Sequence, residues 1–176
     1  MRTLTLLRHA KSSWDDPSLA DFDRPLAPRG QKAAPAMGIH MHELGLAPDL
    51  VLCSPAVRTR ETARLALAEL ASSEPPMKLM PELYEASAET LLAQIHKVSR
   101  RHRHLLLIGH NPGLHDLVLG LLEKRPSGDL ATKMPTAALA VLECDITSWA
   151  DLRWHSARLE HYQTPRRLGR SGTGPR

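Results

Sequence analysis

The sequence predicts an α/β fold: a three-layer α/β/α sandwich whose central sheet is mostly parallel. Short apolar runs alternate along the chain with longer segments in which apolar residues recur at helical spacing. With 176 residues, of which 42% are hydrophobic, the chain is long and apolar enough to bury one core. Two late apolar runs joined by a short turn predict an antiparallel hairpin at the C-terminal end of the sheet.

Each expected element follows from its local pattern. Short apolar runs predict strands at residues 4–7, 50–53, 77–80 and 105–108. Helical spacing predicts helices at residues 30–44, 56–70, 89–100 and 113–122. The hairpin strands are expected at residues 137–143 and 152–159, with the turn near 145–148. These elements form one expected domain over residues 1–162.

The charge of the chain is concentrated near its C-terminus. The net charge is +4, and after Glu160 the chain carries Arg166, Arg167, Arg170 and Arg176 but no acidic residue. We therefore expect a basic, flexible tail at residues 163–176. Without these four arginines the domain is close to neutral. Aromatic residues make up only 3% of the chain, which argues against base stacking, so no nucleic-acid partner is expected.

The sequence also bears on the compartment. It has no run of about 18 apolar residues and no basic, apolar and small-residue leader pattern at its start, so neither a membrane span nor a signal peptide is expected. Cys53 and Cys144 are far apart and lie in apolar runs. Two isolated cysteines are typical of a reduced, cytoplasmic protein.

Unusual polar residues follow three of the expected strands. Arg8 and His9 follow the first strand, Ser54 follows the second with Arg58 one helical turn further, and His110 follows the strand at 105–108. Taken singly, each could be a surface residue or a turn residue. Because ligands of open α/β sheets bind beyond the carboxyl ends of the strands, their joint occurrence favours a common site.

The junctions after two of these strands favour anion binding. Ser54 and Asn111 are expected to be N-caps, with Pro55 and Pro112 at first-turn positions, so that two helix N-termini point at the site. Helix N-termini attract anions, and guanidinium groups match phosphoryl oxygens. Phosphate is therefore the expected ligand.

Three ordered motifs then resemble those of the histidine phosphatase (phosphoglycerate mutase-like) superfamily. They are LRHAK at residues 7–11, SPAVRTRETA at 54–63 and GHNP at 109–112, and the resemblance spans roughly residues 3–160. The short chain, RHAKSSW at 8–14 and DFDRPL at 21–26 resemble the SixA-like branch of protein phosphohistidine phosphatases. Ala10 stands where the wider family usually has glycine, which adds a methyl group but removes no catalytic group.

The resemblance implies a phosphatase that works through a phosphohistidine intermediate and needs no metal or other cofactor. His9 would be the nucleophile, and Arg8, Arg58 and His110 would hold the phosphoryl oxygens. The expected partner is a phosphorylated substrate, a phosphohistidine protein in the first instance. The alternatives are a phosphatase for a small sugar or metabolite phosphate and a binding module without turnover.

The sequence does not decide which residue is the acid that protonates the leaving group. Glu82 and Glu85 are the candidates, with Glu85 favoured, and each could instead be a solvated turn residue. SixA-like members are described as lacking this acid. Asp21, Asp23 and Arg24 are expected to brace the loop after the first strand, with a contact to substrate as the alternative. His40 and His42 are expected on a solvated helix face, because residues two apart on a helix diverge by about 200° and cannot easily share a metal.

Overall fold

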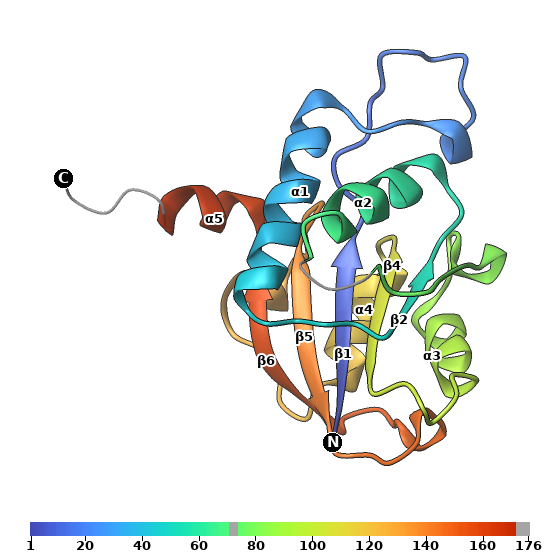
Figure 1. Cartoon of the computed structure of the whole chain (residues 1–176), viewed down its shortest axis with the longest axis vertical. Helices are drawn as coiled ribbons and strands as arrows, with labels where there is room; N and C mark the ends of the chain where they lie inside the picture. The colour runs from blue at the N-terminus through green and yellow to red at the C-terminus, as the bar shows by residue number, and fades with distance from the viewer. Residues whose placement is uncertain (71–73, 172–176) are drawn as a thin grey trace.

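A computed structural model describes residues 1–70 and 74–171 and shows an α/β protein built on one six-stranded sheet (Figure 1). The strand order is β3-β2-β4-β1-β5-β6. β3, β2, β4 and β1 pair in parallel, whereas β5 is antiparallel to both β1 and β6. The strands are β1 (Arg2–Arg8), β2 (Leu50–Cys53), β3 (Met77–Leu79), β4 (His104–Gly109), β5 (Leu139–Cys144) and β6 (Ala157–Gln163). The predicted fold class is confirmed.

Helices cover both faces of the sheet, which gives the three layers (Figure 1). α1 and α2 lie on one face and α3 and α4 on the other. The helices are α1 (Pro28–Glu43), α2 (Val57–Leu67), α3 (Ala88–His96), α4 (Gly113–Leu121) and α5 (Pro165–Ser171). No helix within residues 1–70 and 74–171 is both long and apolar enough to cross a membrane.

Alternation along the strands divides the core into two halves. In β4, Leu105 and Leu107 pack toward α3 and α4, whereas Leu106 and Ile108 pack toward α1 and α2. All four side chains are fully buried. This two-sided burial is the reason why the strand reads as a continuous apolar run in the sequence.

The C-terminal hairpin forms, but its second strand lies further along the chain than predicted. β6 covers Ala157–Gln163 rather than 152–159, and the connection from β5 contains a short 3₁₀ helix at Trp149–Asp151. The Trp149 side chain is fully buried and its Nε1–H donates to the His102 carbonyl oxygen at 2.7 Å. This packing, together with buried Leu152, holds the segment against the core instead of in the sheet.

The segment predicted to be a tail begins as α5. This helix contacts α1, and Leu168 packs against the core between α1, α2 and the sheet. Residues 71–73 and 172–176 lie outside the described part of the chain.

Candidate active site

The carboxyl ends of three adjacent parallel strands deliver the central residues of the site. β1 pairs with β4 up to Arg8 and Gly109, and the backbone N–H of His9 then donates to the Gly109 carbonyl oxygen at 3.1 Å. His110 follows immediately. On the other side of β4, the N–H of Ser54 donates to the Ile108 carbonyl oxygen at 3.1 Å. The register of the sheet therefore places His9, Ser54 and His110 side by side.

A pocket of about 350 Å³ opens above these strand ends. Its lining includes all five residues assigned to the site from the sequence, namely Arg8, His9, Arg58, His110 and Glu85. Glu82, the other candidate acid, is exposed and does not line the pocket. The structure thus brings together the predicted cations and histidines, and of the two candidate glutamates only Glu85 lines the same pocket.

His9 is held as a neutral imidazole. Its Nδ1 lies 2.8 Å from the Ala10 carbonyl oxygen, which can only accept, so Nδ1 carries the proton and Nε2 the lone pair. Burial is the largest cause that lowers the pKa of His9 to about 3; the hydrogen bond to Ala10 opposes this shift, and the charges of His110, Arg58 and Arg8 contribute to it. A neutral ring with a lone pair at Nε2 is the form that can act as a nucleophile.

His110 is neutral for a related reason. Arg58 Nη2 lies 3.3 Å from His110 Nδ1, and because a guanidinium can only donate, Nδ1 accepts and Nε2 carries the proton. Nε2 donates to Ser54 Oγ at 2.6 Å. Burial is the largest cause that lowers the pKa of His110 to about 4, followed by the charge of Arg58. The two histidine rings lie 5.2 Å apart between centroids.

Arg8 and Arg58 supply the positive charge. Arg8 Nη1 donates to the Met134 carbonyl oxygen at 3.0 Å, while its buried Nε has no hydrogen-bond partner among the described residues. Burial, with Arg58 nearby, lowers the pKa of Arg8. A buried donor without a partner costs free energy, so this guanidinium gains from an added acceptor such as an oxyanion.

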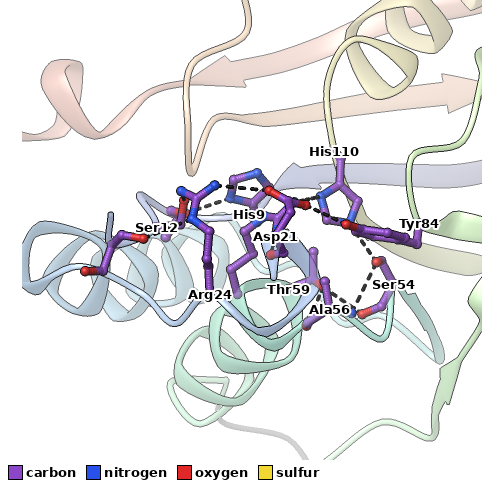
Figure 2. A network of polar contacts seen from close by, with 12 residues as sticks. His9, Ser12, Asp21, Arg24, Ser54, Ala56, Thr59, Tyr84 and His110 are labelled. Atoms are coloured by element: carbon purple, nitrogen blue, oxygen red, sulfur yellow. Dashed lines mark hydrogen bonds and ion pairs between the residues drawn. The ribbon is translucent and has the colours of Figure 1, made fainter. Parts of the chain in front are cut away.

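Asp21, which was expected mainly to brace the loop after the first strand, also lines the pocket. Its Oδ2 accepts from Arg58 Nη2 at 2.9 Å and from the Tyr84 hydroxyl at 2.5 Å, and its carbonyl oxygen accepts from Arg58 Nη1 at 2.6 Å (Figure 2). The Tyr84 hydrogen bond and the Arg58 charge hold the pKa of Asp21 low despite partial desolvation. Asp21 also pairs with Arg24 at 3.1 Å.

The predicted loop bracing is confirmed for Arg24. Its Nη2 donates to Ser12 Oγ at 2.6 Å and its Nε to the Ser13 carbonyl oxygen at 3.0 Å. The guanidinium also stacks on the Trp14 ring, 3.2 Å from its centroid. The loop after β1 is therefore held by contacts among its own residues, and Asp21 connects this loop to Arg58.

The predicted helix caps are wrong. α2 begins at Val57 after Ala56, and α4 begins at Gly113 after Pro112, so each helix starts later than a Ser54 or Asn111 cap would require. The Ser54 hydroxyl contacts His110 instead. Asn111 Nδ2 donates to the Met134 carbonyl oxygen at 2.8 Å. Ser54 Oγ also accepts from the Ala56 N–H at 3.5 Å, whereas the buried Oδ1 of Asn111, the atom that a cap would use, has no hydrogen-bond partner among the described residues.

Glu85 lies at the rim of the pocket with an exposed side chain. Its carboxylate makes no hydrogen bond or ion pair with any residue that the structure describes. Its backbone φ of 52° falls in the left-handed region, which is uncommon for a residue other than glycine. Such outliers cluster at functional sites, although this one also shapes the turn that leads into α3.

No group of three or more His, Cys, Asp or Glu side chains within the described residues is arranged to hold a metal ion. His42 is exposed, in line with the solvated face expected for it. That expectation is wrong for His40, whose Nε2 lies 2.8 Å from Nε2 of His161 on β6. The sequence pattern of one helix could not reveal a partner on a distant strand.

Comparison with known proteins identifies the family of the chain. A family model described as the histidine phosphatase superfamily (branch 1) matches residues 4–92. An uncharacterised protein of Mycobacterium leprae (strain TN) is 34% identical over 167 residues, covering 91% of this chain and all of that protein. The chain belongs to the histidine phosphatase superfamily.

Solved structures show which branch of this superfamily the chain resembles. A protein provisionally assigned as the phosphohistidine phosphatase SixA of Nakamurella multipartitia is 32% identical with a TM-score of 0.79, covering 93% of this chain and 96% of its own. Its counterpart from Agrobacterium tumefaciens is 28% identical with a TM-score of 0.76, covering 93% and 98%. The protein histidine phosphatase SixA complexed with tungstate shares the fold, at 20% identity and a TM-score of 0.77 over 94% and 99%. The chain is SixA-like, as its motifs predicted.

Proposed function

We propose that this protein is a phosphatase that removes the phosphoryl group from phosphohistidine in proteins, through a phosphorylated His9. The observation that carries the proposal is the state of His9, a neutral imidazole whose Nε2 lone pair lies in a pocket lined by Arg8, Arg58 and His110. The SixA assignments of the two similar bacterial proteins support the choice of substrate. The two free, buried cysteines suit the cytoplasm, where we place the reaction.

In the first step, His9 Nε2 attacks phosphorus. The new N–P bond forms as the bond from phosphorus to the substrate imidazole breaks, and that imidazole leaves as the neutral base, with the proton that its other ring nitrogen already carries. The Nδ1–H of His9, which donates to the Ala10 carbonyl oxygen, stabilises the charge on the phosphorylated ring. In the second step water attacks phosphorus, inorganic phosphate leaves and the proton of the water goes to solvent, which restores neutral His9.

The cations act on the transferred group. Arg8 and Arg58 are positioned to bind the phosphoryl oxygens, and His110 Nε2–H, which now donates to Ser54, can turn to an oxygen. Such charge supplies what a divalent cation provides in other phosphoryl-transfer sites. We therefore propose that turnover is independent of metal, and that a chelator leaves it unchanged.

A labelled-substrate experiment tests the proposal. Rapid quenching with a ³²P-labelled phosphohistidine peptide is expected to trap acid-labile, base-stable label on wild-type enzyme but not on the His9→Ala variant. A substrate panel of phosphohistidine, phosphoserine, phosphotyrosine and sugar phosphates is expected to favour phosphohistidine. Fast turnover without label on the enzyme would instead indicate direct attack by water.

One observation favours a second candidate, a phosphatase for a small metabolite phosphate. Glu85 lines the pocket, and a carboxyl group there can protonate an alkoxide leaving group, which a phosphate ester requires and phosphohistidine does not. Preferential cleavage of alkyl phosphates in the same panel would establish this candidate in place of the first.

A further inference from the structure

A second cavity, of about 590 Å³, adjoins the catalytic pocket and shares Lys11 and Thr136 with it. Its other walls come from the first half of α1, from the segment before β5 and from the junction of β6 with α5. In Figure 1 these segments meet on the side of the sheet where α1 and α5 lie. The reaction proposed above uses none of the residues that line this cavity alone.

The cavity is strongly basic. It is lined by five cationic side chains, those of Lys11, Arg29, Lys32, Lys133 and Arg166. None of the five forms an ion pair with another described residue, whereas Asp129, the one acidic group in the lining, pairs with Arg167 at 3.5 Å. Like charges gathered around one hollow repel each other and attract an anionic ligand.

The opposite edge of the catalytic pocket has the reverse charge. There, a groove of about 770 Å³ shares Glu85 and Asn111 with the pocket and is also lined by Glu89 and Asp116. The catalytic pocket thus lies between a positive cavity and a negative groove. When a polypeptide places one side chain in the pocket, its acidic residues are attracted to the positive cavity and repelled by the negative groove.

We propose that the basic cavity binds an acidic segment of the phosphoprotein substrate, close to the phosphohistidine. This inference rests on the proposed function. The catalytic pocket, at about 350 Å³, accommodates the phosphoimidazole group, so the rest of a protein substrate must cross the rim of the pocket. Lys11 lies on the part of the rim that the pocket shares with the basic cavity. Ala33, Ala36 and Leu168 add apolar surface for the aliphatic parts of glutamate side chains.

Two matched charge reversals test the inference. Arg29→Glu with Lys32→Glu changes the cavity at residues that do not line the catalytic pocket. Lys124→Glu with Arg125→Glu makes the same change of net charge in a separate hollow beside Ala157. Substrates are an acidic phosphohistidine peptide, its glutamine-substituted counterpart, phosphoimidazole and a small bisphosphate. Binding of the fluorescent, unphosphorylated acidic peptide is measured in parallel, because it does not depend on turnover.

Wild type is expected to favour the acidic over the neutral peptide about tenfold in kcat/KM at low salt, mainly through KM. The cavity variant is expected to lose this preference and to lose binding of the unphosphorylated peptide, while it still cleaves phosphoimidazole. The control variant is expected to retain the preference for the acidic peptide and the binding of the unphosphorylated peptide. Equal kcat/KM for the two peptides in wild type, or equal binding by both variants, would overturn the inference.

Two further outcomes separate this inference from the proposed function. In one outcome, no phosphohistidine compound is cleaved, wild type still binds the unphosphorylated acidic peptide, and only the cavity variant loses this binding. The proposed function then fails and the acidic-segment site stands. If small bisphosphates are the preferred substrates and only the cavity variant loses them, the cavity binds a second phosphate and the acidic-segment inference is wrong.

Discussion

At the scale of single residues, Asp21 joins three side chains of the site. It engages both terminal nitrogens of Arg58, one through its carboxylate and one through its carbonyl oxygen, and it joins Tyr84 and Arg24. A carboxylate beside a phosphate-binding arginine has two opposing effects. It fixes the guanidinium, which favours turnover, and it repels the phosphoryl oxygens, which weakens binding.

Asp21→Asn separates these effects. The variant retains the shape of the side chain but removes the negative charge next to Arg58. We expect inhibition by inorganic phosphate to become tighter by a few-fold, while kcat falls by about tenfold because Arg58 is held less firmly. Steady-state kinetics with phosphate as a competitive inhibitor measure both, and Asp21→Glu, which retains the charge, should leave phosphate binding near wild type. Weaker phosphate binding in Asp21→Asn would contradict this assignment.

Glu85 offers a second test at this scale, with Glu82 as its matched control. Both are exposed glutamates of the same connection, but only Glu85 lines the pocket. For phosphohistidine, Glu85→Gln is expected to leave kcat within a few-fold of wild type, because imidazole leaves as a weak base. For alkyl phosphates, a working general acid is worth about 10²–10⁴-fold, so any such activity should fall with Glu85→Gln and not with Glu82→Gln.

If Glu85→Gln instead lowers the rates on phosphohistidine and on alkyl phosphates alike by two orders of magnitude, Glu85 is the general acid for both. The metabolite phosphatase would then be the better description of the protein.

The sequence predicted those site residues that directly follow a strand or lie one turn into the next helix. His9 and His110 come immediately after apolar runs, and the order of parallel strands brings such positions together whatever the loops do. Asp21 and Tyr84 could not be placed in the same way. They lie in irregular connections, where no periodic pattern indicates the direction of a side chain.

At the scale of elements, helix periodicity predicted the existence of α1 to α4, but tertiary contacts that no local pattern shows decided how Ser54 and Asn111 are used. Ser54 and Asn111 are residue types that often cap helices, but the shortest hydrogen bonds of their side chains are with His110 and with the Met134 carbonyl oxygen. The shifted β6 has a similar cause. Leu152 is apolar because it packs in the core beside Trp149, not because it is in a strand.

The contact between α1 and α2 gives a prediction for an element. A Cβ on Gly38 would lie 2.2 Å from the carbonyl oxygen of Ala66 and 2.8 Å from its Cα, and backbone atoms cannot move aside as a flexible side chain can. Gly38→Ala is therefore expected to force the helices apart and to destabilise the protein by about 1–3 kcal/mol. Because α2 carries Arg58, phosphate affinity should fall as well.

Urea unfolding and phosphate binding measure these two effects, with Gly169→Ala in α5 as the control. A Cβ at Gly169 meets no described atom within 4 Å, so this change should be neutral or slightly stabilising. Equal stability of Gly38→Ala and wild type would mean that the α1–α2 contact yields easily.

At the scale of the whole molecule, the fold positions the site by placing the carboxyl ends of β1, β2 and β4 side by side and covering both faces of the sheet. The same cover takes His9 and His110 out of water, and this lowers the pKa of His9 to about 3 and of His110 to about 4, from 6.5. Burial of these two histidines in their neutral form makes global stability depend on pH.

The sign of that dependence follows from proton binding. Below pH 6.5 the unfolded chain binds protons at these two histidines, whereas the folded protein does not until the pH approaches 4 and then 3. Their stabilising contribution is thus fully present above pH 6.5 and is lost as the pH falls toward the folded-state values. Asp21, whose pKa is lowered from 3.8, adds a similar loss, but only at more acidic pH.

We therefore expect the free energy of unfolding in urea to fall between pH 6.5 and 5 by up to about 1.4 kcal/mol per pH unit for each of the two histidines. A His9→Gln, His110→Gln double variant should show a shallower slope over the same range, whatever its absolute stability. His104 and His161, whose pKa values burial also lowers, account for a residual slope in that variant. His42→Gln, at an exposed position, should leave the wild-type slope unchanged. If the double variant lost stability with acid as steeply as wild type, His9 and His110 would not be the buried neutral groups described above, and the proposed nucleophile would lose its main support.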